Sequence, residues 1–165
     1  MIVVADTSVL LNLACIDEIG RLRDLFHEIV IPVEVDLEYR RLASEVPRFD
    51  GLALPAWIAT RAVTRESELV RDAVGLDPGE SAALSLAVEL DADAVLIDER
   101  RGHQVAVQLG LATVGVLGIL LQSKRLGLID AVLPRIERLE RLAGFWISPG
   151  LRTRVLDLAG ERSGA

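Results

Sequence analysis

The sequence predicts an α/β fold, a three-layer sandwich with a central parallel β-sheet and helices on both of its faces. Short continuous apolar runs, typical of strands buried on both sides, alternate along the chain with segments of helical spacing. This alternation favours a parallel sheet built with right-handed crossovers. At 165 residues, 51% of them hydrophobic, the chain is long enough for one sizeable core and shows no internal repeat. We therefore predict a single domain over residues 1–165, with C-terminal helices at about 129–160 packed on it.

The predicted strands are apolar runs bounded by turn residues or by an acid. In chain order they span residues 2–5, 29–31, 58–63, 94–97 and 112–116. The first and the fourth of these runs are each followed at once by an aspartate, Asp6 and Asp98. A brief extended piece is also expected at residues 145–147.

The predicted helices share apolar residues spaced three or four apart. In chain order they span residues 9–13, 19–26, 32–46, 66–74, 78–90, 102–109, 118–125, 129–143 and 149–159. Pro32 is expected to open the third of them, because proline is suited to the first helical position. The fifth has the clearest start, since Asp77 precedes Pro78 and Glu80 follows three residues after this cap. Residues 47–57, rich in proline and glycine, predict a loop.

Composition excludes several classes of protein. The net charge of −7, from 18 basic and 25 acidic residues, argues against a basic face that holds duplex nucleic acid by its phosphates. With one cysteine and two histidines, the chain forms neither an intramolecular disulfide nor a four-ligand Cys/His zinc site. Charge-free apolar runs such as residues 114–121 fall well below the roughly 18 residues of a membrane-spanning helix. No basic region of a signal peptide is visible, so we expect a cytoplasmic protein.

Two aspartates mark the edge of the sheet at which parallel sheets bind their ligands. Asp6 and Asp98 each follow an apolar strand directly, and the space beyond the carboxyl ends of the strands is the usual ligand crevice. If the two strands are neighbours, about 4.8 Å apart, the carboxylates repel each other unless one is protonated or a cation lies between them. The alternative is that each aspartate caps the helix that follows it.

Two glutamates lie on helix faces that we expect to point inward. Glu38 falls on the apolar stripe of the helix predicted over 32–46, so its carboxylate needs a cation or a hydrogen-bonding partner. The alternative is a boundary residue paired with Arg40 or Arg41. Glu80 shares a helix face with apolar neighbours, but its place at the third helical position is also explained by capping and by the helix dipole.

These four acids come from four separate elements and are each predicted to point toward the same end of the sheet. Four hard oxygen donors suit Mg²⁺ or Mn²⁺. A cation site of this kind attracts a phosphodiester, lowers the pKa of a water molecule and stabilises the leaving oxygen. The cation also reverses the local charge, so an acidic protein can bind RNA at one spot without a basic coat.

Three nearby residues are candidate helpers. Ser8 is a candidate auxiliary ligand through its hydroxyl group or a water molecule, with capping of the first helix as the alternative. Arg100 and Arg101, just past Asp98, are candidate phosphate contacts or else solvated side chains.

The chain resembles a PIN domain over nearly its whole length, in particular the branch of PIN-like proteins similar to VapC-type toxins of toxin–antitoxin pairs. Four segments carry the resemblance, in order and at fitting distances: Val3-Val-Ala-Asp6-Thr-Ser8, Ile31-Pro32-x-x-Val35-x-x-Glu38, Gly79-Glu80-Ser-Ala-Ala-Leu-Ser-Leu-Ala87 and Leu96-Ile-Asp98-Glu-Arg100. The ending, from Val116 to Gly144-Phe-Trp-Ile-Ser148, is similar to the tail of that branch.

The resemblance implies metal-dependent endoribonuclease activity on single-stranded RNA, a homodimer, and a cognate antitoxin protein that blocks the site. It implies that the metal ligands are Asp6, Glu38, Glu80 and Asp98. Glu99 becomes a candidate additional acid, or else an exposed residue. His103, where this branch more often carries arginine, is a candidate phosphate contact.

Our leading hypothesis is a Mg²⁺- or Mn²⁺-dependent ribonuclease that is the toxin of such a pair. The second hypothesis is a catalytically silent binding and dimerisation module, supported by the long apolar region 126–158. A small-molecule phosphohydrolase is the third, although the chain has no glycine-rich phosphate loop.

Overall fold

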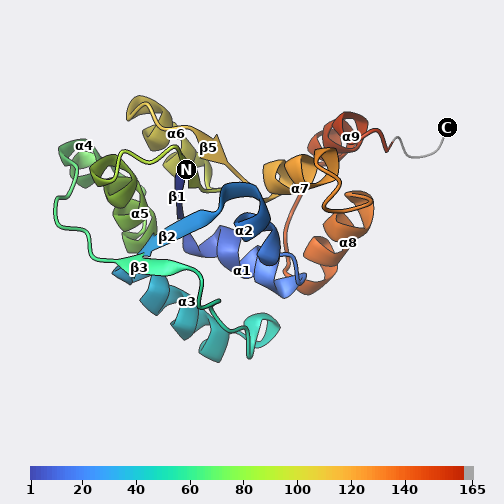
Figure 1. Cartoon of the computed structure of the whole chain (residues 1–165), viewed down its shortest axis with the longest axis horizontal. Coiled ribbons are helices and arrows are strands. Elements are labelled where there is room, and N and C mark those ends of the chain that lie inside the picture. The colour runs from blue at the N-terminus through green and yellow to red at the C-terminus, as the bar shows by residue number, and fades with distance from the viewer. Residues whose placement is uncertain (162–165) are drawn as a thin grey trace.

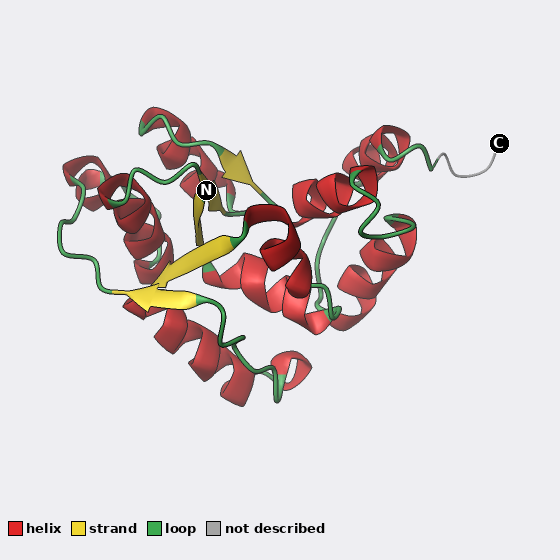
Figure 2. Cartoon of the chain, viewed as in Figure 1, coloured by secondary structure: helices red, strands yellow, loops and turns green. Residues whose placement is uncertain are grey.

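The computed structural model describes residues 1–161 of the chain, and at its centre is a five-stranded parallel sheet of order β3-β2-β1-β4-β5. The strands are β1 (Ile2–Ala5), β2 (Glu28–Pro32), β3 (Ala59–Arg61), β4 (Ala94–Leu96) and β5 (Thr113–Val114). Figure 2 shows that helices surround these strands. The predicted α/β sandwich with a central parallel sheet is confirmed.

The first four long helices flank the strands β1, β2 and β4. They are α1 (Thr7–Cys15), α2 (Gly20–Phe26), α3 (Val33–Glu45) and α5 (Pro78–Glu89). The remaining helices are η1 (Pro47–Phe49, a 3₁₀ turn), α4 (Glu68–Asp72), α6 (Arg100–Gln108), α7 (Val116–Arg125), α8 (Leu133–Leu142) and α9 (Pro149–Leu158).

The helices form layers on the two sides of the sheet (Figure 1). Helix α5 packs against β1, β2 and β4, and α3 lies at the edge, where it contacts both α5 and α1. On the other side α2 contacts β2, α1 and α2 both contact α7, and α8 contacts α1. Because both faces of the central strands are covered, Val3, Val4 and Ala5 are fully buried, which explains the continuous apolar run of β1.

Helix α5 begins where its sequence predicts. The Asp77 side chain accepts a hydrogen bond from the Glu80 amide (2.7 Å), and the Glu80 side chain accepts one from the Asp77 amide (3.1 Å). This reciprocal capping box satisfies two amides that the first turn leaves without helical partners. The helix behind it is buried on nearly all sides, so α5 is a central support of the sheet.

Several element boundaries differ from the expectations. Pro32 ends β2 rather than opening α3, and Val116 begins α7 rather than ending a strand. Helix α8 begins at Leu133 instead of 129, because Glu161 accepts hydrogen bonds from the amides of Val132 (2.7 Å) and Leu133 (3.0 Å). Pro134, in the first turn of α8, is a local signal for this start. The cap that Glu161 supplies from a distant part of the sequence leaves no such signal.

The C-terminal helices are tied to the rest of the molecule by ion pairs. Arg135 of α8 binds Glu18, which precedes α2, at 3.0 Å, and Lys124 of α7 binds Glu161 at 2.9 Å. Along residues 1–161, no helix has both the length and the apolar character needed to cross a membrane.

Candidate active site

The two strands that precede the candidate aspartates are neighbours. Strand β1 pairs with β4 in parallel register, with Ala5 opposite Leu96, and the Asp6 amide donates to the Leu96 carbonyl at 2.9 Å. The order of the sheet reverses between β1 and β4, since successive connections lead to opposite sides of β1. In open α/β sheets such a switch point forms the crevice where ligands bind. Asp6 and Asp98 therefore lie at the edge of the sheet best suited to a functional site.

Asp6 is a buried acid with an unpartnered oxygen. Its residue is only 3% exposed, and although it occupies the N-cap position of α1 its side chain makes no capping hydrogen bond. Its Oδ1 and the Ser8 hydroxyl oxygen are buried, and within residues 1–161 neither has a hydrogen-bond partner. The buried Thr7 hydroxyl lies between these two residues in the sequence and lowers the pKa of Glu38 by hydrogen bonding. Unpartnered oxygens on Asp6 and Ser8 are unusual, because a buried polar group normally finds a partner. Capping does not account for Asp6.

Glu38 approaches the same place from α3. A β-carbon built on Gly79 would lie 3.1 Å from Glu38 Oε2 and 3.5 Å from Asp6 Oδ1, so both oxygens border one point beside the start of α5. The expected alternative partners of Glu38 form their ion pairs with other residues, Arg40 with Asp36 and Arg41 with Glu45, although the charge of Arg41 also lowers the pKa of Glu38. Burial, followed by the nearby Asp77 carboxylate, raises the pKa of Glu38.

Asp77 is a site neighbour that the sequence pattern assigned only to capping. Its Oδ1 lies 3.4 Å from the same β-carbon position on Gly79, and its charge raises the pKa values of Asp6, Glu38 and Glu80. Glu80 is buried, and desolvation is the largest cause of its raised pKa. One oxygen of Glu80 is committed to the capping box, as the alternative explanation of this residue anticipated.

Asp98 has a different surrounding from Asp6. Its carboxylate accepts a hydrogen bond from the amide of Val116, at 3.2 and 3.4 Å to its two oxygens, and a β-carbon on Gly115 would overlap its Oδ1. Asp98 therefore caps α7, which begins after the neighbouring strand β5, and not the helix that follows it in sequence. Although the residue is exposed to the groove described below, the protein atoms around its carboxyl group raise its pKa to about 6.

The expected repulsion between Asp6 and Asp98 needs correction. The pKa of Asp6 is raised to about 7 by burial above all, and the charges that add to it belong to Asp77, Glu80 and Glu38. Asp98 has Glu99 as its charged neighbour. The Asp98 side chain points to the Val116 amide of α7. For this reason the pairing of β1 with β4 does not by itself bring the two carboxylates face to face.

A groove of about 800 Å³ is lined by two of the four candidate acids, Glu38 and Asp98, whereas Asp6 and Glu80 are not among its lining residues. Ser8, Glu38, Asp98 and Glu99 line it together with Arg100. The groove also has a wall of apolar and aromatic side chains from η1, α7 and the segment between α8 and α9. Asn12 and Arg48 line it too, and neither was among the candidates from the sequence.

Two of the three candidate phosphate contacts lie outside this groove. Arg101 donates to the Val74 carbonyl at 2.7 Å and packs beside Gly75, so it holds the connection between α4 and α5. His103 Nδ1 lies 2.7 Å from the Thr113 hydroxyl oxygen on β5. Arg100 alone of the three faces the candidate acids.

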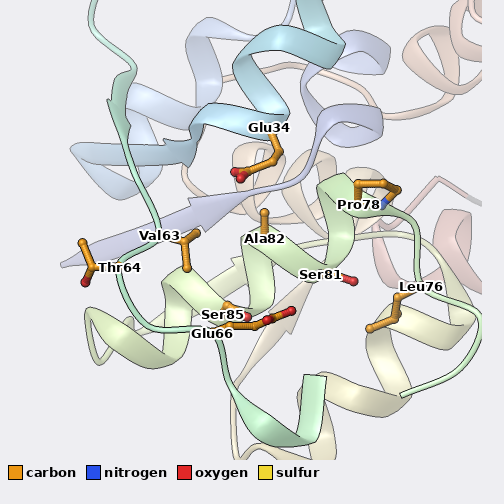
Figure 3. Close-up of a pocket in the computed structure, with 9 residues that line it drawn as sticks. All are labelled: Glu34, Val63, Thr64, Glu66, Leu76, Pro78, Ser81, Ala82 and Ser85. Atoms are coloured by element: carbon orange, nitrogen blue, oxygen red, sulfur yellow. The ribbon is translucent and has the colours of Figure 1, made fainter. Parts of the chain in front are cut away.

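A separate hollow of about 630 Å³ lies between the start of α3, the stretch after β3 and α5 (Figure 3). Glu34, Glu66, Ser81 and Ser85 are among the residues that line it, and the Ser85 hydroxyl already accepts a hydrogen bond from the Ser67 amide. None of the four candidate acids borders this hollow. The larger groove is therefore the candidate active site.

The candidate acids fit a divalent cation only in part as they stand. Across residues 1–161, no three Asp, Glu, His or Cys side chains converge closely enough to hold a metal ion. The oxygens of Asp6 and Glu38 nevertheless border one point, and within residues 1–161 the buried Asp6 and Ser8 oxygens have no hydrogen-bond partner. Oxygen donors of this type suit Mg²⁺ or Mn²⁺.

The comparisons with known proteins concern the family and the fold. A family model described as a PIN domain matches residues 2–161. A solved structure, a PilT N-terminus domain protein from the hyperthermophilic archaeon Sulfolobus solfataricus P2, is similar with a TM-score of 0.53 and 18% identity, over 74% of this chain and 93% of that one. At this identity the likeness concerns the fold. No curated protein matches the chain.

Proposed function

The chain belongs to the PIN-domain family, and on this premise we propose that it is a metal-dependent endoribonuclease that cleaves single-stranded RNA. PIN domains are typically nucleases and generally use divalent metals. The observation that carries the proposal is that oxygens of Asp6 and Glu38 border one point beside Gly79, and that the Asp6 oxygen is buried without a hydrogen-bond partner within residues 1–161. Buried carboxylate oxygens of this kind are stabilised by a bound cation.

Asp6 and Glu38 are the residues that would hold the metal, with Glu80 and Asp98 as further ligands. When bound, a divalent ion supplies positive charge that attracts a phosphodiester and lowers the pKa of water. The buried position of Asp6 limits hydration of its carboxylate, so a bound cation relieves the cost of its charge. The α7 amide holds Asp98 at the groove, and in this proposal Asp98 acts from there as a further ligand.

The groove also selects the form of the RNA. Single strands have unstacked bases and a backbone that bends into a crevice, whereas a duplex is a stiff rod read mainly from its outside. Ser8 and Arg100 border the groove beside the acids. In this proposal Arg100 contacts a phosphate, and Ser8, whose hydroxyl oxygen is buried, assists the site beside Asp6.

We further propose the biological setting that the VapC-type resemblance implies. The protein acts as a toxin, is a homodimer in the cytoplasm, and is blocked by a cognate antitoxin protein that occupies the groove. Expression in a bacterial host should arrest growth, and Asp6→Asn should abolish the arrest. Arrest by the Asp6→Asn protein at equal expression would contradict a toxin that acts through cleavage.

The decisive experiment follows cleavage of a fluorescent single-stranded RNA with Mn²⁺, Mg²⁺ or EDTA. We expect cleavage with the metals, none with EDTA, and a loss of at least a hundredfold in Glu38→Gln. Glu34→Gln is the matched control, because Glu34 lies one turn earlier on the same helix and lines the other hollow. If the folded wild-type protein leaves the RNA uncut and is not stabilised by Mn²⁺, the nuclease proposal is overturned. That result would favour a silent binding module.

A further inference from the structure

An exposed tryptophan lies on the wall of the candidate active-site groove. Trp146 is 81% exposed, although its segment borders the same groove as Ser8, Glu38 and Asp98. The other tryptophan, Trp57, packs half-buried against the core. An indole exposed to water loses the stabilisation that burying its large apolar surface would give. Its exposure in the candidate active-site groove therefore indicates a ligand with a flat apolar face.

The segment that carries Trp146 is anchored on both sides. Ala143 and Ile147 are buried, and the Phe145 amide donates to the Leu139 carbonyl at 3.1 Å. Gly144 has a φ of +66°, a backbone conformation that glycine adopts without strain. The indole is thus presented by a held backbone, so little conformational entropy is lost when a ligand stacks on it.

Two arginines on the groove have no acidic partner. Within residues 1–161, neither Arg48 nor Arg100 takes part in an ion pair, whereas Arg40, Arg41 and Arg135 do. The Arg48 guanidinium lies 4.7 Å from the centre of the Phe49 ring, and its side chain approaches to 3.9 Å of the β-carbon position on Gly144. In a chain of net charge −7, unpaired guanidinium groups beside an exposed aromatic ring suit an anionic, aromatic ligand.

We propose that Trp146 stacks on an unpaired base of the RNA substrate, next to the cleavage site, while Arg48 and Arg100 contact its phosphates. This inference rests on the proposed nuclease function and names the element that makes the groove select single strands. Aromatic stacking with arginine contacts is how proteins bind single strands with little sequence preference, because every base has a π-face. Bases within a duplex are already stacked on each other and cannot engage the ring in this way.

A partner protein would also find an exposed tryptophan attractive, and aromatic residues are common in protein interfaces. The position of this one favours RNA. It shares one groove with two of the candidate metal ligands, Glu38 and Asp98, and with Arg48 and Arg100. An aromatic ring, cations and metal-binding acids in one groove suit the base, the phosphates and the scissile bond of a single strand.

The first test uses the fluorescence of Trp146. The chain has two tryptophans, so in the Trp57→Phe variant Trp146 is the only one left. Stopped-flow mixing with decauridylate and Mn²⁺ should quench its emission before products accumulate, and a blunt RNA duplex of the same length should not. Full-length protein is used throughout.

The second test uses steady-state cleavage of a single-stranded RNA. Trp146→Ala should raise KM about tenfold or more, as expected for one lost stacked base, and leave kcat within about twofold. Trp146→Phe should keep most of the affinity. Leu158→Ala is the control, because Leu158 is also a largely exposed apolar residue but does not border the groove.

The outcomes separate this inference from the proposed function. Metal-dependent cleavage with no quenching and an unchanged KM in Trp146→Ala would overturn the stacking role and leave the nuclease standing. Quenching by RNA without any cleavage would support the stacking role and overturn the nuclease. A change of oligomeric state in Trp146→Ala with unaltered RNA binding would assign the ring to a protein interface instead, and so overturn the inference.

Discussion

Glu38 Oε2 lies 3.1 Å from the position that a β-carbon of Gly79 would occupy. The missing side chain of Gly79 leaves the space into which the carboxylates of Asp6 and Glu38 both reach. No unusual backbone angle requires glycine at this position of α5, since its φ is not among the positive ones. Gly79 therefore allows the carboxylates of Asp6 and Glu38 to approach the same point.

Gly79→Ala should separate metal binding from stability. The added methyl group pushes Glu38 away from Asp6, so Mn²⁺ affinity and cleavage should fall about tenfold or more. The metal-free protein should be equally stable or more stable by about 0.5–1 kcal/mol, because alanine favours helix over glycine. Calorimetric titration with Mn²⁺ and urea unfolding measure the two effects.

Gly150→Ala is the matched control for this substitution. Gly150 also follows a proline in the first turn of a helix, and a β-carbon there would meet no atom within 4 Å. It should show the gain in stability without a loss of metal binding. Equal Mn²⁺ affinity in Gly79→Ala and wild type would show that the two acids do not share a cation.

Asp98 should have two separable roles. Asp98→Ala removes the acceptor of the Val116 amide and should lower the free energy of unfolding by about 1 kcal/mol, the usual cost of a lost helix cap. Asp98→Asn keeps an acceptor oxygen and should stay within about 0.5 kcal/mol of wild type, but it should lose cleavage. If Asp98→Asn cleaves RNA at the wild-type rate, the acid is only a cap of α7. Urea unfolding and RNA cleavage distinguish these cases.

Metal affinity should rise with pH up to about 7. The pKa of Asp6 is raised to about 7 and that of Asp98 to about 6, so below these values protons compete with the cation for the carboxylates. For each proton that Mn²⁺ must displace, its affinity falls by up to about tenfold when the pH is lowered by one unit. Titrations between pH 5 and pH 8.5 should show this slope and then a plateau. An affinity independent of pH would exclude both acids as ligands.

Without metal, the stability of the fold should fall as pH rises from about 4 to about 7. Asp6 has a pKa of about 7 when folded against 3.8 as its ordinary value, so in this window the folded state keeps a proton that the unfolded state has released. One such group contributes a slope of at most about 1.4 kcal/mol per pH unit. Urea unfolding in EDTA should show a shallower slope for Asp6→Asn. Identical slopes for the two proteins would mean that Asp6 is not protonated in the fold.

Arg100 should contribute to the salt dependence of RNA binding. A lost phosphate contact on a single strand lowers the slope of log affinity against log salt by about 0.7, and Arg100→Gln should show this change. Arg101→Gln is the control, because that neighbouring guanidinium is held by the Val74 carbonyl outside the groove. Fluorescence anisotropy with labelled decauridylate measures both slopes, and equal slopes for Arg100→Gln and wild type would remove Arg100 from the interface.

Local signals in the sequence determined the alternation of strands and helices, the α5 capping box and the two aspartates at strand ends. They did so because each depends on residues a few positions apart, such as Asp77 with Glu80 or the apolar run before Asp6. Glu38 could likewise be placed on an inward face from helical spacing alone.

Only the tertiary structure decided where these side chains point and what they meet. Asp98 turns to the amide of Val116, Glu161 sets the start of α8, and Arg101 and His103 are held away from the groove. Each of these contacts joins atoms that the sequence keeps apart, or selects one among several rotamers. Packing between distant elements makes that selection, and no local pattern records it.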